Sequence, residues 1–365
     1  MKTIAFYLPQ FHPIPENDKW WGEGFTEWHN VRKARALFEG HRQPQIPGEL
    51  GYYDLRNNEI RHKQESLAQK YGIDAFCYYH YWFNGKQLLE TPLTKLLNDS
   101  DCTMPFCLCW ANENWSRAWD GKDHEILMEQ AYSPEDHQRH AEHLCEIFKD
   151  NRYLKSKNKP IFIIYRVGMI PDAVVFIQIL NETAIKAGFD GVRVFAVRNH
   201  SCNVPDEKLA AWGIQDIVDF EPNSHDFPKR SLIGKSIRFL QRKWNYFAKK
   251  WHGPEFYSIL KIDYKAIVEN SLSLYGTLSE HHYPTVFPNW DNSPRRKAAT
   301  IIQNDSPDEF TNWTRAAAKI IRKRPENNQF LFVNAWNEWA ESAHLEPDQE
   351  MGFSFLEAFK KGLEC

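Results

Sequence analysis

Long hydrophobic runs and a pronounced net charge are absent from this sequence of 365 residues. No segment approaches the roughly 18 apolar residues that suggest a membrane-spanning helix. The N-terminal segment 1–9 lacks the apolar stretch and small-residue cleavage site of a signal peptide. The net charge of −3 gives no sign of a nucleic-acid partner. We therefore expect a soluble cytoplasmic protein with neither a membrane span nor a nucleic-acid partner; the sequence does not indicate its oligomeric state.

Cofactor-binding motifs are missing as well. No glycine-rich phosphate-binding turn follows the first strand-like run, which argues against a dinucleotide site and a doubly wound sheet. The seven cysteines include one close pair, Cys107 and Cys109, but this pair lies in an apolar run and has no second pair at zinc-finger spacing. We predict reduced core cysteines, no bound metal and no other cofactor.

Linkers rich in proline, glycine or serine, internal repeats and low-complexity tracts are also absent. Short apolar runs rich in β-forming residues alternate with longer charged segments of helical period, which is typical of βα units around a parallel sheet. The eight runs that we predict as strands are Thr3–Leu8, Ala75–Tyr81, Pro105–Trp110, Pro160–Tyr165, Val192–Val197, Ile217–Phe220, Thr285–Phe287 and Phe330–Ala335.

The segments between these strands are predicted to be helical. The longer ones are Asn58–Tyr71, Pro134–Phe148, Pro171–Ala187, Leu232–Lys250, Pro307–Arg322 and Met351–Leu363, and the shorter ones are Thr91–Asn98 and Asp206–Trp212. Eight strands that each precede a helical segment close most naturally as a barrel. We therefore predict the α/β fold class, with residues 1–365 forming a single-domain (β/α)8 TIM barrel with extended βα loops. The basic segment 231–262 is a candidate insertion.

Aromatic residues, in contrast, are abundant, with 14 Trp, 15 Tyr and 24 Phe. A large core accounts for some of them, but their number exceeds what a core of this size needs. Flat rings at an accessible cleft suit the apolar faces of sugar rings. The composition therefore favours a carbohydrate ligand.

Aromatic, amide and charged side chains follow nearly every predicted strand. In a barrel of this class, the active site is built from the carboxyl ends of the strands and the loops after them. We therefore predict that these side chains bind an oligo- or polysaccharide substrate. A single member such as His80 is equally compatible with a buried structural role. The predicted binding residues are Tyr7, Gln10, His12, Trp21, Glu23, Glu27, Trp28, Tyr79, His80, Tyr81, Trp82, Trp110, Asn112, Glu113, Trp115, Arg166, Trp290, Asp291, Asn337 and Trp339.

Two glutamates after the last predicted strand are the predicted catalytic residues. Glycosyl transfer needs an acid at the leaving oxygen and a second carboxylate within roughly 5–10 Å. Glu338 and Glu341 would meet this requirement in a helical turn, where their Cβ atoms would be about 5–6 Å apart. Such proximity separates their pKa values, so that one serves as acid and the other as base. The alternative is a solvated helix N-terminus, but the flanking Trp336 and Trp339 favour catalysis.

Six segments resemble the WbsX-type proteins of bacterial polysaccharide gene clusters, which are described as glycoside hydrolase family 99-like. The resemblance extends over nearly the whole chain. The matching segments are Phe6–His12, Trp20–Trp28, Phe76–Phe83, Cys109–Trp115, Phe287–Asp291 and Asn337–Glu341.

A more distant resemblance, mainly in the last of these segments, is to endo-acting α-mannosidases. These barrels cleave α-mannosides with retention through a 1,2-anhydro sugar. The resemblance implies that Glu338 is the base that takes the proton from the sugar 2-hydroxyl, and that Glu341 is the acid/base at the glycosidic oxygen. The 2-oxygen must attack anti to the leaving group, which a manno-configured ring allows.

We predict a retaining glycosidase or transglycosidase acting on a manno-configured bond of a bacterial surface polysaccharide. The alternative is a glycosyltransferase of O-antigen or capsule biosynthesis, because WbsX-type proteins are associated with building such polysaccharides. A sugar-nucleotide enzyme would need a diphosphate site, often a metal held by paired aspartates after a strand, and the only such pattern, 99–101, precedes one. Strand-end Arg166 and Arg198 could instead serve a phosphate. A catalytically silent glycan-binding barrel would not need both glutamates.

Overall fold

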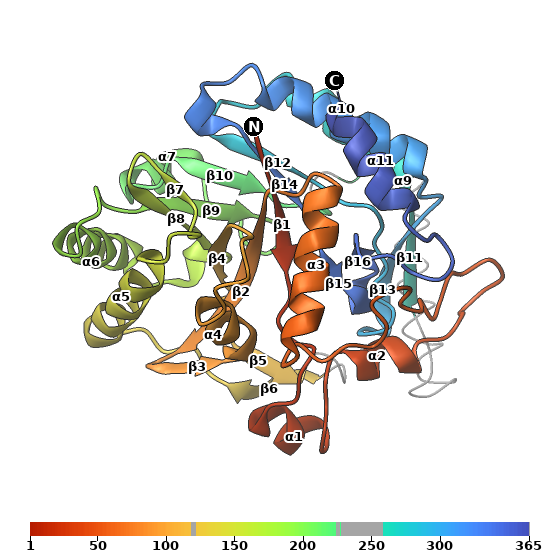
Figure 1. The fold of residues 1–365 in the computed structure, drawn as a ribbon, viewed down its shortest axis with the longest axis horizontal. Helices are drawn as coiled ribbons and strands as arrows, with labels where there is room; N and C mark the ends of the chain where they lie inside the picture. The colour runs from red at the N-terminus through yellow and green to blue at the C-terminus, as the bar shows by residue number, and fades with distance from the viewer. Residues whose placement is uncertain (118–121, 224–226, 228–257, 365) are drawn as a thin grey trace.

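The computed structural model describes residues 1–117, 122–223, 227 and 258–364 (Figure 1). Eight parallel strands form a closed ring, in which β1 pairs with β14 on one side and with β2 on the other. This confirms the predicted (β/α)8 barrel. The strands are β1 (Lys2–Tyr7), β2 (Ala75–Phe83), β4 (Phe106–Trp110), β8 (Lys159–Ile164), β9 (Arg193–Arg198), β10 (Asp216–Asp219), β12 (His282–Val286) and β14 (Phe330–Val333).

The barrel strands are apolar because both of their faces are covered. All five residues of β4 are buried, as are five of the six residues of β8. One face of each strand points into the barrel and the other packs against the helices, so no polar face is needed. Cysteines are part of this packing, and the six described ones are free and buried, as predicted.

Helices surround the barrel, and several begin where the sequence supplies a cap. The Ser133 side chain accepts a hydrogen bond from the Asp136 amide and Ser306 accepts one from the Glu309 amide, each with proline at the first helical position. The helices after the barrel strands are α3 (Asn58–Lys70), α4 (Thr91–Leu97), α5 (Pro134–Phe148), α6 (Ala173–Lys186), α7 (Asp206–Ala211), α9 (Tyr264–Tyr275), α10 (Pro307–Ile321) and α11 (Ser354–Leu363).

The connection between β10 and β12 differs from the prediction. Helix α9 was not predicted, although the Asp263 carboxylate caps it by accepting a hydrogen bond from the Ala266 amide. The predicted helix at 232–250 lies outside the described residues, as does most of the candidate insertion 231–262. Residues 258–262 belong to β11 (Ser258–Asp263), which pairs in parallel with β13 (Ala298–Gln303) outside the barrel. The single-domain organisation stays a prediction.

The extended βα loops carry structure of their own. The first contains α1 (Pro15–Trp21) and α2 (Trp28–Lys33), and the second contains β3 (Lys86–Leu88). Strands β5 (Trp115–Arg117) and β6 (Lys122–Met128) follow β4, and lie with α1 at the lower edge of Figure 1. After β14 come β15 (Asn337–Glu338), the 3-10 turn η5 (Trp339–Glu341) and β16 (Ala343–His344). These loops build the site described below.

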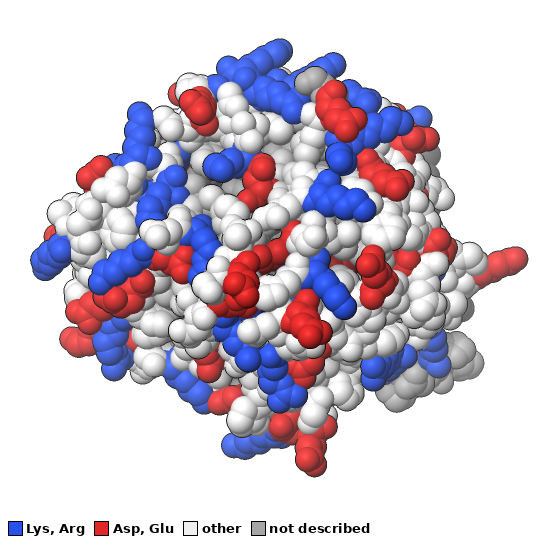
Figure 2. All heavy atoms as spheres, in the orientation of Figure 1, with Lys and Arg blue, Asp and Glu red and all other residues white. Residues whose placement is uncertain are grey.

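The surface carries charges of both signs. On the face shown in Figure 2, Lys and Arg side chains are interspersed with Asp and Glu, without a broad field of one sign. Among the helices in the described part of the chain, none has the length and apolar character to cross a membrane.

Candidate active site

A cavity of about 310 Å³ opens at the carboxyl ends of the barrel strands. Its wall combines aromatic rings with charged and amide groups, the lining expected of a sugar site. Nine of the predicted site residues border it, namely Gln10, Tyr79, Tyr81, Glu113, Trp115, Arg166, Trp290, Glu338 and Glu341.

The guanidinium of Arg295 joins the two predicted catalytic glutamates. Its Nη2 lies 3.0 Å from Glu338 Oε2, and its Nη1 lies 2.9 Å from Glu341 Oε1. Its Nε donates to Oε1 of a third carboxylate, the fully buried Glu27, at 2.8 Å. We refer to Arg295, Glu27, Glu338 and Glu341 as the arginine clamp.

The clamp limits the distance between the two predicted catalytic glutamates. Because Glu338 and Glu341 contact one guanidinium, their contacting oxygens lie no more than roughly 8 Å apart, which does not exceed the separations found in glycosidase carboxylate pairs. The second oxygen of each carboxylate has no hydrogen-bond partner among the described residues and is not enclosed by protein. Each glutamate therefore keeps one oxygen for a ligand in the cavity.

The loop after β14 holds this geometry through backbone and side-chain ties. The Asn337 carboxamide accepts a hydrogen bond from the Leu8 amide at 2.7 Å and donates to the Leu8 carbonyl at 3.0 Å, which fastens the loop to the end of β1. Glu338 pairs with Ala343 across the short β15–β16 ladder. The predicted helical turn is a single 3-10 turn that begins after Glu338, because this ladder constrains the glutamate itself to a strand.

Burial raises the pKa of two carboxyl groups in the cavity wall. Burial raises the pKa of Glu338 to about 8; Arg295 lowers it, whereas the Glu341 and Glu27 carboxylates raise it. Burial also raises the pKa of Glu113, against the lowering effect of its ion-pair partner Arg166. The clamp therefore contains a carboxyl group that can carry a proton near neutral pH.

Aromatic rings form part of the cavity lining. Tyr165 packs edge-on against both Tyr79 and Phe220, with ring centroids 5.9 and 5.5 Å apart. Tyr81 packs edge-on against Trp115 at 5.2 Å, and the Gln10 side chain donates to the Tyr81 hydroxyl at 3.0 Å. Rings held in this way offer rigid stacking surfaces for a sugar.

Comparison with known proteins identifies the family. A profile of the family described as "Glycosyltransferase WbsX" matches residues 3–359. The chain belongs to the WbsX family. It is also 38% identical over 362 residues to "Uncharacterized protein WxcX" from Xanthomonas campestris pv. campestris, a match that covers 99% of this chain and 49% of the relative. This WbsX chain thus spans about half the length of the curated relatives it matches.

Two solved structures share the fold of the WbsX chain at 13% sequence identity. One, described as "Glycoside hydrolase-like protein", has a TM-score of 0.58, and the alignment covers 100% of this chain and 94% of that one. The other, a GH99 endo-alpha-mannosidase from Bacteroides thetaiotaomicron, has a TM-score of 0.56, with 99% and 95% covered. The barrel therefore has the fold of glycoside hydrolases, and the resemblance found in the six sequence segments is confirmed.

Four predicted site residues of the WbsX chain lie on the outer side of the barrel. The Tyr7 hydroxyl donates to Gln64 of α3 at 2.7 Å. His80 is hydrogen-bonded to His140 of α5 at 2.9 Å, and the indole N–H of Trp82 reaches Asp136 of the same helix. The Trp110 indole N–H donates to the Trp82 carbonyl oxygen at 3.4 Å. Strand residues alternate between the two faces, so His80 and Trp82 point away from the side that Tyr79 and Tyr81 occupy.

Four further predicted residues are buried in the loops and do not border the cavity. Asn112 binds the Arg166 backbone in both directions, at 2.8 and 2.9 Å, and so positions that arginine. Trp28 packs against Trp339, whose indole N–H donates to Glu346 at 2.6 Å. His12 is buried, and burial lowers its pKa to about 4. Together with Asn337 and Glu27, these buried residues pack behind the side chains that line the cavity.

The remaining predicted residues occupy three different places. Trp21 borders an adjoining cavity of about 170 Å³. Glu23 is exposed in the loop after α1. Asp291 borders a separate cavity, where its carboxylate accepts a hydrogen bond from Gln43 at 2.8 Å and contacts the His41 ring at 2.7 Å.

Nine residues of the cavity wall were not predicted. Arg295 is the most consequential, and no strand-end position marks it, because it lies in the loop between β12 and β13. Tyr165, Phe220 and Asn334 directly follow β8, β10 and β14, so the same strand-end rule could have included them. The full set is Leu8, Ala111, Tyr165, His200, Phe220, Asn292, Arg295, Arg296 and Asn334.

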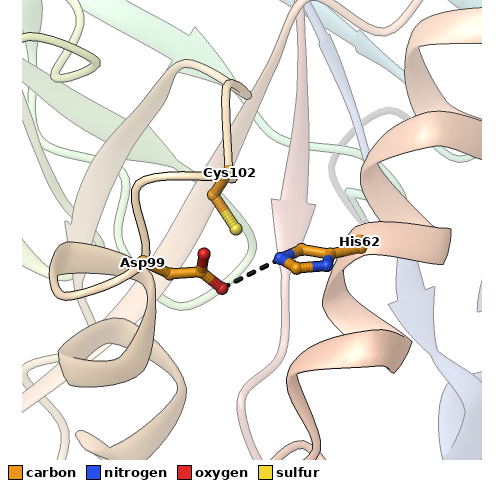
Figure 3. A group of neighbouring side chains, drawn as sticks. All are labelled: His62, Asp99 and Cys102. Carbon is orange, nitrogen blue, oxygen red and sulfur yellow. Dashed lines mark hydrogen bonds and ion pairs between the residues drawn. The ribbon is translucent and has the colours of Figure 1, made fainter.

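The aspartate pattern at 99–101 takes part in a cluster away from the cavity. Figure 3 shows His62, Asp99 and Cys102, whose ligand atoms lie within 4.8 Å of one another. The guanidinium of Arg61 contacts both Asp99 and Cys102, and His62 Nε2 lies 2.9 Å from Asp99. Burial raises the pKa of Cys102 to about 12, so its thiol stays protonated. A buried cation already balances this cluster, which argues against a metal or diphosphate site here.

Proposed function

We propose that this protein is a retaining carbohydrate-active enzyme, a glycosidase or transglycosidase, that acts on a manno-configured bond of a bacterial surface polysaccharide. The arginine clamp is the observation that carries the proposal. It holds two carboxylates on one guanidinium, close enough to act on the same bond, and leaves one oxygen of each to a cavity lined with aromatic rings. The fold shared with glycoside hydrolases supports the same conclusion.

The proposed reaction uses the sugar 2-hydroxyl as the nucleophile. Glu338 takes the hydroxyl proton while the 2-oxygen attacks the anomeric carbon, and Glu341 gives its proton to the departing glycosidic oxygen. This forms a 1,2-anhydro sugar. Water or a sugar hydroxyl then opens the ring at the anomeric carbon, Glu341 takes the incoming proton, and Glu338 returns a proton to the 2-oxygen. Two inversions give net retention, and the anti attack requires a manno-type ring.

This role for Glu338 predicts how kcat/KM depends on pH. Burial raises the pKa of its carboxyl to about 8, so the group is largely protonated at lower pH and then cannot accept the hydroxyl proton. The active, ionised form accumulates as the pH rises through about 8. Because the same step also needs a proton donor, we expect kcat/KM for a neutral oligosaccharide to rise with pH as Glu338 ionises and to fall again at higher pH as the proton donor is lost, which gives a bell-shaped profile. A profile that falls steadily from roughly pH 5 to pH 9 would exclude Glu338 as the base.

Manno-configured oligosaccharides test the proposal, with the products identified by mass and by anomeric configuration. We expect retained products from the parent substrate and no turnover of its 2-deoxy or 2-fluoro analogue, because these lack the hydroxyl that Glu338 would deprotonate. The parent gluco-configured oligosaccharide is the matched control and should also be inert. A covalent adduct on Glu338 would instead indicate an ordinary double displacement.

A second candidate function is glycosyl transfer in O-antigen or capsule synthesis, because the matching family is described as a glycosyltransferase. The clamp could serve both reactions, since opening the anhydro sugar with a sugar hydroxyl completes a transfer. Among the described residues the only three-ligand cluster for a metal is His62, Asp99 and Cys102, which lies away from the cavity and is balanced by Arg61. Incubation with sugar nucleotides and, separately, with oligosaccharide donors plus acceptors distinguishes the two functions.

A further inference from the structure

The predicted catalytic cavity adjoins the smaller cavity that Trp21 borders. This second cavity, of about 170 Å³, also contacts Asn17 and Asn114. Four residues border both cavities and therefore form their common wall, namely Gln10, Glu113, Trp115 and Arg296. The second cavity therefore lies next to the cavity that contains the arginine clamp.

Arg296 differs from the other two arginines of the catalytic cavity, because it has no carboxylate of its own. Arg295 forms ion pairs within the clamp, and Arg166 forms an ion pair with Glu113. Arg296 is exposed and, in the part of the chain that the structure describes, its side chain makes no ion pair or hydrogen bond. Its backbone N–H donates to the Asn292 carbonyl at 2.9 Å, which fixes where the side chain leaves the loop.

The chemistry of this common wall favours an anion over a neutral sugar. A planar guanidinium presents parallel N–H donors that match a carboxylate or phosphate. Glu113 lies near Arg296 but is already bound by Arg166, so it does not neutralise both arginines. Trp115, packed edge-on against Trp20 at 5.7 Å and against Tyr81 at 5.2 Å, provides a ring beside which a sugar can stack.

We propose that the second cavity binds an acidic sugar unit, adjacent to the bond that is broken or formed, through an ion pair between its carboxylate or phosphate and Arg296. This inference rests on the proposed glycoside function and adds that the glycan is anionic. A neutral sugar unit would leave the Arg296 guanidinium hydrated, whereas the anionic group of an acidic unit would form an ion pair with it.

Three disaccharides with the same α-linked mannose skeleton test the inference. The first is neutral mannobiose, the second carries a uronate carboxylate on its reducing-end unit, and the third carries a 6-phosphate on that unit. Dissociation constants are measured by calorimetry in the Glu341→Gln background, which removes turnover. We expect at least one acidic disaccharide to bind about tenfold more tightly than mannobiose, and the better of the two identifies the anion. Raising the ionic strength from about 0.05 M to about 0.5 M should reduce this preference.

Arg296→Gln should remove the preference and leave the affinity for mannobiose within about twofold, because only the charged contact is lost. Lys297→Gln is the matched control, since it removes the neighbouring exposed charge, which borders neither cavity, and should keep the preference. Equal affinities for all three disaccharides, or a preference that survives Arg296→Gln, would overturn the acidic subsite while leaving the proposed catalysis intact. Binding of none of them would remove the manno-configured substrate, and the inference with it.

Discussion

Glu341→Gln is expected to lower kcat by about 10³-fold while leaving substrate affinity within about twofold. The amide has the shape of the carboxylate, and its oxygen can still accept the hydrogen bond from Arg295 Nη1, which lies 2.9 Å from the carboxylate in the structure. The clamp should therefore keep its geometry. What the amide cannot do is give a proton to the glycosidic oxygen or take one from the incoming acceptor.

The nature of the leaving group makes this test specific. A 2,4-dinitrophenyl α-mannoside has a leaving group that departs without protonation, so its first step should be much less impaired by Glu341→Gln than that of an oligosaccharide. Glu357→Gln, on the exposed face of α11, is the control for the chemical change alone and should retain full activity. Comparable turnover of oligosaccharide by the Glu341→Gln variant and the parent enzyme would remove Glu341 from the acid/base role.

The barrel could be predicted from the sequence because its signal is local. Each barrel strand is a short apolar run followed by a helical segment, and caps such as Ser133 and Ser306 mark where helices begin. The position of the strand ends then places Glu338, Glu341 and the aromatic residues at one face of the barrel. Helix α9 was missed because it follows the long segment whose period was assigned to a helix at 232–250.

The strand-end rule does not predict which side of the barrel wall each strand residue faces. All four residues 79–82 were predicted to bind substrate, but a strand has a period of two, so only Tyr79 and Tyr81 can share the cavity side. His80 and Trp82 pack against α5 instead. Applying the period to the strand would have divided these residues correctly.

Arg295 could not be predicted, because its importance comes from contacts between distant segments. It lies 268 residues from Glu27 and 43 from Glu338 in the sequence, and only the closed barrel brings these three together. In the sequence it is one of two adjacent arginines after a proline, and nothing local distinguishes it from Arg296. In the structure the two differ, because Arg295 is surrounded by carboxylates and Arg296 faces the cavities.

This difference predicts a large loss of stability for one of two otherwise similar substitutions and almost none for the other. Arg295→Met is expected to lower the free energy of unfolding at pH 8 by about 3–5 kcal/mol, because it leaves the buried carboxylates of the clamp without their cation. Arg296→Met removes an exposed charge without an ion-pair partner in the described residues, and should change stability by less than about 0.5 kcal/mol. Urea denaturation of both variants measures the contrast. Equal stabilities would show that the clamp does not depend on Arg295.

The pH dependence of Arg295→Met follows from the same charges. Arg295 lowers the pKa of Glu338, so its removal raises that pKa further above the value of the unfolded chain. Between about pH 4.5 and pH 8, Glu338 is protonated in both folded proteins, so it lowers the stability of both equally as the pH rises. Above about pH 8, Glu338 ionises in the parent but stays protonated in the variant, so the stability of the variant continues to fall. The contribution of Glu338 to the deficit should therefore grow as the pH rises above about 8 and change little between about pH 5 and pH 7.

Substitution of Glu27 tests whether Arg295 stabilises the protein by balancing a buried carboxylate. It is fully buried, one of its oxygens has no hydrogen-bond partner among the described residues, and Arg295 is its only ion-pair partner there. In the Arg295→Met background, Glu27→Gln should restore about 1–3 kcal/mol of stability at pH 8, because it removes an unbalanced charge. In the parent protein the same change should destabilise, because Arg295 loses a partner. A double-mutant cycle in which the two effects simply add would show that Glu27 and Arg295 are not coupled.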